Sequence, residues 1–122
     1  MIHWADQVDE SWNDVLAELT RVFERSRVAA QAGESLVYVV KQDDLLGRRG
    51  AGNAMVATGL LSAARTAALE GARNGWTANV VAYDEGADRG AVQAWAKRLL
   101  EAGDVTGELI RVGSGHVGKT LP

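Results

Sequence analysis

The amino-acid sequence predicts an α/β fold: a three-stranded parallel sheet with the element order α-β-α-β-α-β. A short apolar run rich in β-branched residues, Leu36 to Val40, indicates a strand that is buried on both faces, and two further runs, Thr77 to Ala82 and Glu108 to Val112, are predicted strands. Each run follows a segment of helical length and composition. Helix-length connections between consecutive strands require those strands to be parallel, and such crossovers are expected to be right-handed.

The first helix is predicted to begin at Ser11, because Asp14 follows three residues later in the pattern of a capping box, with Asp in place of the usual Glu. Its apolar residues recur at steps of three and four and form one stripe: Trp12, Val15, Leu16, Leu19, Val22 and Phe23. Gly33 is the predicted stop. The first strand is then expected over Leu36 to Val40.

A glycine-rich loop, GRRGAGN, leads into a second helix from about Asn53 to Arg73. Small residues occur on nearly every side of this helix, so we expect it to be buried against several neighbours. Asn74-Gly75 is typical of a left-handed C-cap.

The remaining elements follow the same alternation. A second strand is expected over Thr77 to Ala82, and Asp88 is predicted to open a third helix. The apolar face of that helix carries Val92, Trp95, Ala96, Leu99 and Leu100. A third strand is expected over Glu108 to Val112, followed by a glycine-rich tail.

Composition narrows the class of protein. We expect 122 residues to form a single domain, 1–122, with residues 113–122 as a flexible tail. The net charge of -3, with acids and bases interspersed, argues against nucleic-acid binding. No apolar stretch approaches the ~20 residues that span a bilayer, the first ten residues are too polar for a signal peptide, and the chain has no cysteine. These features predict a cytoplasmic protein that binds no membrane.

Two glycine-rich segments have a possible link to phosphate binding. Residues 113–120 match the pattern of a P-loop, but that motif requires a helix beginning at Lys119-Thr120, and only Leu121 and Pro122 follow. We therefore favour a flexible tail. Glycines at 47, 50 and 52, with Arg48 and Arg49, are either an anion site or a turn into the second helix, and the spacing favours the turn.

Few residues promise catalysis or metal binding. His3 and His116 lack partners at ligand spacing, so we expect both to be solvated and no metal to bind. Asp43 and Asp44 follow the first predicted strand, where α/β proteins place their chemistry. Either could act as a base, although a solvated loop is the simpler interpretation.

Four segments, in order, resemble the C-terminal half of the short-chain dehydrogenase/reductase family. DESWNDVLAELTRVFERSR is similar to the long interface helix after the family's fourth strand, and ESLVYVV to the strand that ends in the catalytic Ser. LLSAARTAALEGARNGWTANVV is similar to the next helix and strand, and VTGELIRVGSG to the closing strand. The resemblance implies a truncated, partial Rossmann-like unit that lacks the dinucleotide-binding half.

The resemblance also implies that the family's catalytic groups are missing. It places Asn53 at the position of the family's catalytic Tyr and Ala57 at that of its Lys, so neither a phenol nor an ammonium is available. The Ser position falls near Val40 to Gln42 and the Asn position near Glu18 or Leu19; Tyr83-Asp84 lies close to where the family has Pro-Gly. We therefore expect no catalytic residue and no cofactor.

The expected role is that of a non-catalytic subunit. The resemblance implies assembly through the first two helices, either with a second copy or with a full-length short-chain dehydrogenase. The candidate interface residues are Trp12, Val15, Leu19, Val22, Phe23, Gly59 and Ala63. The loss of earlier strands would leave Leu36–Val40 as a sheet edge.

Three alternatives remain open. The candidate interface side chains could pack inside the monomer. The chain could be a small enzyme with new chemistry at Asp43, Asp44 or Tyr83, or a module that binds a ligand in a remnant substrate pocket.

Overall fold

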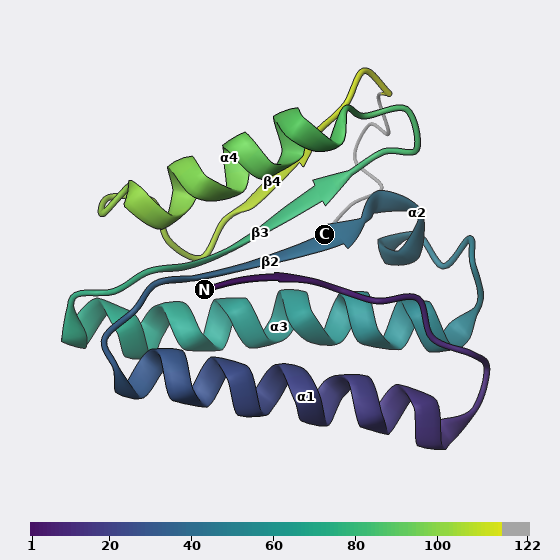
Figure 1. The fold of residues 1–122 in the computed structure, drawn as a ribbon, viewed down its shortest axis with the longest axis horizontal. Helices are drawn as coiled ribbons and strands as arrows, with labels where there is room; N and C mark the ends of the chain where they lie inside the picture. Colours follow the sequence, from purple (N-terminus) through teal and green to yellow (C-terminus); the bar gives the residue numbers. More distant parts are fainter. Residues whose placement is uncertain (116–122) are drawn as a thin grey trace.

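The computed structural model describes residues 1–115. They form a sheet of four parallel strands in the order β1-β2-β3-β4, with helices between them (Figure 1). The predicted α/β class and parallel sheet are confirmed, but the prediction of three strands was wrong. The additional strand, β1 (Ile2–Trp4), precedes the first helix and pairs with β2, so Leu36–Val40 is not a sheet edge.

The other elements agree closely with the predicted segments. They are α1 (Trp12–Gln31), β2 (Leu36–Lys41), α2 (Gln42–Leu45), α3 (Ala51–Asn74), β3 (Ala78–Tyr83), α4 (Arg89–Glu101) and β4 (Leu109–Val112). Only the single turn α2 had no counterpart in the sequence analysis. None of the described helices is both long enough and apolar enough to cross a membrane.

The predicted helix ends are confirmed. Ser11 Oγ accepts the Asp14 amide at 3.1 Å, and an Asp88 carboxylate oxygen accepts the Ala91 amide at 3.0 Å. The capping box is not reciprocal, because the Asp14 carboxylate accepts the amide of Asp9 instead of that of Ser11. Gly75 ends α3 in the left-handed conformation, with φ of 81°.

The sheet separates two apolar layers. α1 and α3 cover one face, on which Leu36, Tyr38 and Val40 of β2 project; α4 covers the other face, which receives Val37 and Val39. This alternation is the expected period of two along a strand. Figure 1 shows α1 and α3 side by side beneath the sheet and α4 alone above it.

The α4 crossover departs from the expected handedness. The strands advance in one direction across the sheet, but α4 lies on the face opposite to α1 and α3 (Figure 1). The crossovers through α1 and α3 are right-handed, and the one through α4 has the opposite hand. The prediction of right-handed crossovers throughout was therefore wrong for the last one, an arrangement that is uncommon in parallel sheets. The exception has a structural benefit, because it provides a helix for a sheet face that would otherwise have none.

Candidate subunit interface

Two of the seven candidate interface residues belong to the core of the monomer. Val15 and Val22 are each 3 % exposed and pack between α1 and the sheet, so they are not available to a partner. They lie seven residues apart, which places both on the side of α1 that faces the strands. For these two residues the interpretation as interface was wrong and the alternative, packing inside the monomer, holds.

The neighbouring side of α1 is apolar and uncovered. Trp12 is 63 % exposed, Leu16 46 % and Phe23 65 %, and Leu19 lies half-buried among them. These four residues, called the α1 stripe below, recur at steps of four, three and four and therefore share one side of the helix. Large apolar side chains with this exposure on one helix side are a feature of interaction surfaces.

The side of α3 beside the α1 stripe carries small residues. Ala63 and Thr66 are exposed, and Gly59 is half-buried. A Cβ added at Gly59 would lie 3.6 Å from Leu19 Cδ2, so the glycine side of α3 is in close contact with the stripe. These three residues are called the α3 flank below. The expectation that α3 is buried against several neighbours is confirmed, because it packs on β2, β3, α1 and α2, and this flank is the part that stays uncovered.

A groove of about 870 Å³ separates the C-terminal halves of α1 and α3. Phe23 lies on it from α1, and Ala63 and Thr66 line it from α3. Ser26 and Tyr38, which also line the groove, are joined by a hydrogen bond of 2.7 Å between their hydroxyl oxygens. Burial raises the pKa of Tyr38, so its phenol serves as a neutral hydrogen-bonding group.

Asn53, at the position that the resemblance assigns to a catalytic Tyr, has a structural role. Its side chain is 4 % exposed; Oδ1 accepts the Val8 amide at 2.9 Å and Nδ2 donates to the Arg49 carbonyl at 3.0 Å. The amide therefore ties the segment after β1 to the loop before α3. It has no titratable proton to transfer.

The positions assigned to the Lys and the Ser carry no hydroxyl, and the one ionisable residue among them is Lys41, half-buried at the end of β2. Ala57, at the position assigned to the Lys, is 1 % exposed in the core, and so is Val40 at the first of the positions assigned to the Ser. Gln42, the last of those positions, is buried at the start of α2. None of the three carries a hydroxyl or an ionisable group.

Asp44 and Tyr83, two residues of the alternative enzyme site, lie at the carboxyl end of the sheet. Asp44 is neutralised by Arg49, whose Nε and Nη2 each donate to it at 2.8 Å. The third candidate, Asp43, pairs with Arg48 at 3.1 Å. Burial raises the pKa of Tyr83, against the opposing effect of nearby arginines. The candidate bases are thus engaged by cations, which leaves no free carboxylate for proton abstraction among them.

The glycine-rich segment before α3 is a turn, as the sequence analysis favoured. Gly47 and Gly50 have φ of 72° and 98°. The amide of Gly52, in the first turn of α3, donates to the carboxylate of Glu10 at 2.9 Å. A side chain of the chain itself therefore occupies the place where an anion could bind.

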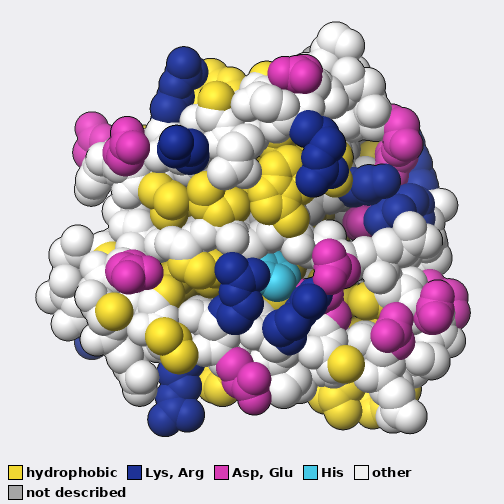
Figure 2. All heavy atoms as spheres, viewed as in Figure 1, with side chains coloured by type: hydrophobic (Ala, Val, Ile, Leu, Met, Phe, Trp, Pro, Cys, Tyr) yellow, Lys and Arg dark blue, Asp and Glu magenta, His cyan; other side chains and the backbone are white. Residues whose placement is uncertain are grey.

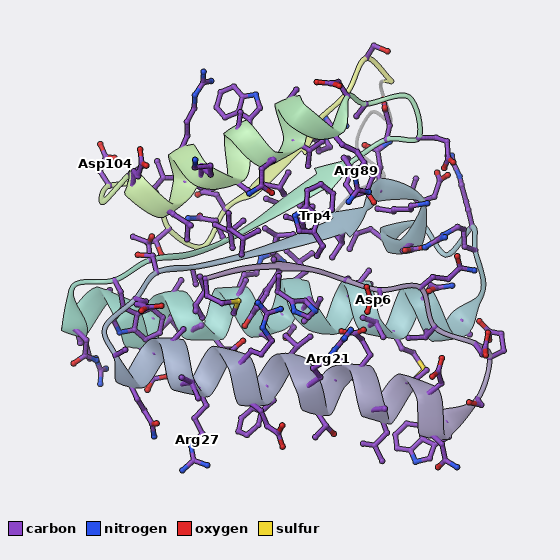
Figure 3. The ribbon with its side chains drawn as sticks, in the orientation of Figure 1. Trp4, Asp6, Arg21, Arg27, Arg89 and Asp104 are labelled. Atoms are coloured by element: carbon purple, nitrogen blue, oxygen red, sulfur yellow. The ribbon has the colours of Figure 1, made fainter. Side chains whose placement is uncertain are left out.

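His3 is buried, at 1 % exposure, so the prediction that it is solvated was wrong. Its Nε2 donates to the Glu18 carboxylate at 2.9 Å, and Arg25 donates to its Nδ1 at 2.5 Å. This donation requires a neutral ring with the proton on Nε2, and burial likewise lowers the pKa of His3. Glu18 also accepts from Arg21, which reaches Asp6 (Figure 3). Sequence reasoning missed this cluster because it missed β1.

The C-terminal candidates lie largely beyond the described residues. His116, Lys119 and Thr120 of the P-loop-like pattern, and most of the expected flexible tail 113–122, are outside residues 1–115. Of the part that is described, the Gly115 amide donates to the Asp84 carboxylate at 2.8 Å. Residues 1–115 contain no cluster of His, Cys, Asp and Glu side chains suited to a metal ion.

No protein-family model matches the chain, and no curated protein matches it. The candidate interface consequently rests on the geometry of α1 and α3.

Proposed function

We propose that this chain is a non-catalytic subunit that acts by association, and that its first partner is a second copy of itself. The observation that carries the proposal is the uncovered α1 stripe beside the α3 flank. Association would remove Trp12, Leu16 and Phe23 from water, which is the dominant favourable term in forming a protein interface.

The shapes of the two surfaces favour a symmetric pair. The α1 stripe carries large side chains, whereas the α3 flank carries a glycine, an alanine and a threonine. In a two-fold dimer the same surface serves on both subunits, so the large residues of one copy can face the small residues of the other. Arg27 and Glu70 line the groove from opposite helices, which gives the surface both signs of charge for such a pairing.

The absence of catalysis is proposed from the state of the candidate groups. Asn53 has both sides of its amide engaged, and Ala57 is a buried methyl group. Asp43 and Asp44 are each paired with an arginine. A new active site would have to break one of these contacts before a proton could be transferred.

We also propose that the chain is related to the C-terminal half of the short-chain dehydrogenases. The resemblance places α1 after the family's fourth strand, and β1 lies directly before α1. This position of β1 supports the proposal, because the helix that α1 resembles also follows a strand. A full-length dehydrogenase is therefore the second partner to test.

Sedimentation equilibrium of the purified chain, alone and mixed with a full-length short-chain dehydrogenase, tests the proposal. We expect a reversible dimer of the chain alone. If the chain stays monomeric over a roughly 100-fold range of concentration and forms no complex in the mixture, association is refuted as its function. If a complex forms in the mixture but the chain alone does not self-associate, the partner is the full-length dehydrogenase and not a second copy. A nicotinamide-dependent turnover that co-purifies with the chain at constant specific activity through successive columns would refute the non-catalytic assignment.

A further inference from the structure

Among residues 1–115 the sheet ends at β1, and one side of this strand has no neighbour within that range. β1 is the terminal strand in the order β1-β2-β3-β4. The Val37 amide donates to the Met1 carbonyl and the Ala5 amide donates to the Val39 carbonyl, both at 2.9 Å. Because bonding alternates along a parallel strand, the backbone groups of Ile2 and Trp4 point away from β2. Figure 1 shows β1 as the foremost strand of the sheet, with no element in front of it.

On the α4 side of this edge lies an apolar surface. Ile2 and Trp4 are half-buried and pack against the apolar cluster beneath α4, and Leu100 of α4 belongs to the same cluster. Figure 2, in the orientation of Figure 1, shows hydrophobic side chains in a band along this part of the molecule. Trp4 is held in place, because its Nε1 donates to Gln93 at 3.0 Å and the Arg89 guanidinium lies 4.2 Å from the centre of its ring (Figure 3).

On the opposite side of the edge lies a cation without a carboxylate partner. Arg21 pairs with Asp6 and Glu18, whereas Arg25 donates to His3 Nδ1 and, at 3.4 Å, to the carbonyl of Ile2. Within the described part of the chain, Arg25 has no ion pair. Its charge therefore stands at the edge strand, on the α1 side of the sheet, opposite to the apolar surface. In Figure 2 the cyan ring of His3 lies among dark-blue arginine side chains just below the apolar band.

We propose that the β1 edge binds an extended segment of another protein, which adds to the sheet as a fifth strand. The amide of Ile2 and the amide and carbonyl of Trp4 would supply the hydrogen bonds, as in other cases of strand addition, while the Ile2 carbonyl accepts from Arg25. Side chains of a strand alternate between the two faces of a sheet. The segment therefore carries apolar residues toward Ile2 and Trp4 and an acidic residue between them, on the face of Arg25.

The charge of Arg25 argues against a second copy of the chain as the strand that pairs with β1. Two β1 strands paired about a two-fold axis would place His3 against His3 and bring the two Arg25 side chains to the same face of the joined sheet. Two guanidinium groups on the same face repel each other, and neither gains a carboxylate partner. An acidic segment instead provides the carboxylate that Arg25 lacks.

The test uses two synthetic ten-residue peptides with blocked ends, one of alternating Val and Glu and the other of alternating Val and Lys. Both are titrated into the ¹⁵N-labelled full chain. We expect the Val-Glu peptide to shift the amide signals of residues 2–5 and to slow hydrogen exchange at Ile2 and Trp4, whose amides are otherwise free to exchange. A Val-Glu peptide with N-methylated valines, which loses backbone donors, should not give this protection.

Variants of two arginines, one on α1 and one on β4, test the role of charge. Arg25→Glu should weaken binding of the Val-Glu peptide about two- to fivefold, the range for an exposed ion pair, and should improve binding of the Val-Lys peptide. This reversal distinguishes a change in specificity from loss of the fold. Arg111→Glu introduces the same charge on an exposed side chain of β4, at the opposite edge of the sheet, and it should leave both affinities unchanged.

Several outcomes would overturn the proposal. They are equal affinity for the two peptides, binding without protection of Ile2 and Trp4, and absence of binding at millimolar peptide. Protection of these amides that rises with protein concentration in the absence of peptide would instead identify a second copy as the occupant. That result would also contradict the proposal.

Discussion

Removal of the Phe23 side chain is the most direct perturbation of the proposed subunit interface. An aromatic side chain buries about 150–250 Å² when fully covered, and Phe23 is 65 % exposed in the monomer. Complete burial by a partner would therefore remove about 100–160 Å² from water, which corresponds to about 2.5–4 kcal/mol at about 25 cal/mol per Å². A two-fold dimer contains this contribution twice.

Ordering of side chains at an interface consumes part of such a gain, so the area gives an upper bound. We expect Phe23→Ala to weaken the dimer at least about a hundredfold, equivalent to about 2.7 kcal/mol. Because Phe23 is 65 % exposed, the monomer buries only about a third of its area, and the stability of the monomer should fall by no more than about 2 kcal/mol. Sedimentation equilibrium measures the first quantity, and urea unfolding at low protein concentration measures the second.

Val28→Ala is the matched control. Val28 is 68 % exposed on the same helix but lies on the other flank, near Glu34 and Met1 and not along the α1–α3 groove. It should leave the dissociation constant unchanged. If Phe23→Ala changes the dissociation constant less than threefold, or if Val28→Ala changes it equally, the reasoning from the exposed stripe fails.

Three further predictions concern the monomer. Asn53→Ala should cost about 1–3 kcal/mol of stability in urea, because the buried amide of Val8 loses its acceptor. Gly71→Ala should be strongly destabilising by the same measurement, since the new Cβ would lie 2.3 Å from the Trp76 carbonyl oxygen and 2.6 Å from its ring. Burial lowers the folded-state pKa of His3 below the unperturbed 6.5, so the unfolded chain binds more protons than the folded chain. The free energy of unfolding should therefore fall as the pH drops from about 7 to about 5. His3→Gln keeps a donor for the Glu18 carboxylate and should flatten this slope.

Matched variants separate these effects from general damage. Asn13→Ala removes an exposed amide from α1 and should change stability by less than about 0.5 kcal/mol. Gly59→Ala has room for its Cβ, which lies 3.6 Å from Leu19, and should stabilise the monomer through higher helix propensity by up to about 1 kcal/mol. A destabilising Gly59→Ala, a harmless Gly71→Ala, or an unchanged pH slope in His3→Gln would contradict the contacts from which each expectation is drawn.

The features that could be predicted from sequence are those that depend on neighbouring residues. The caps at Ser11, Asp88 and Gly75 each involve atoms within four residues. β2 and β3 are six-residue runs that are mostly apolar, so their burial is apparent from composition. For these elements local propensity and tertiary packing agree, which is why the predicted boundaries differ from the observed ones by only a few residues.

The features that were missed depend on contacts between distant residues. β1 has three residues, one of them a histidine, and it is a strand only because β2 lies beside it some 35 positions later: Ile2 pairs with Val37. His3 is buried because that pairing brings it to Glu18 of α1. No periodicity in the first ten residues could reveal either contact, because each depends on a distant residue and not on the pattern of the segment itself.

The candidate interface shows the same limit within one helix. Val22 and Phe23 are adjacent in one apolar stripe, yet the first is 3 % and the second 65 % exposed. A stripe this wide covers two sides of the helix, and only the positions of the sheet and α3 determine which side is buried. One signal was available: Gly59 and Ala63 lie four residues apart on α3, and small residues at that spacing mark a helix side that neighbours can approach closely.

The two proposed surfaces can be tested independently because they occupy different parts of the molecule. The α1 stripe and the α3 flank lie on the outer side of the helix pair, whereas Ile2 and Trp4 lie on the face of the sheet that α4 covers. Phe23→Ala should therefore abolish the dimer without changing the affinity for the Val-Glu peptide, and Arg25→Glu should change peptide preference without changing the dimer. Since Arg25 and Phe23 are two residues apart on α1, a variant that affects both properties would show that the helix itself had moved. Only the crossed result, in which each variant affects one property, assigns association to α1 and α3 and strand addition to β1.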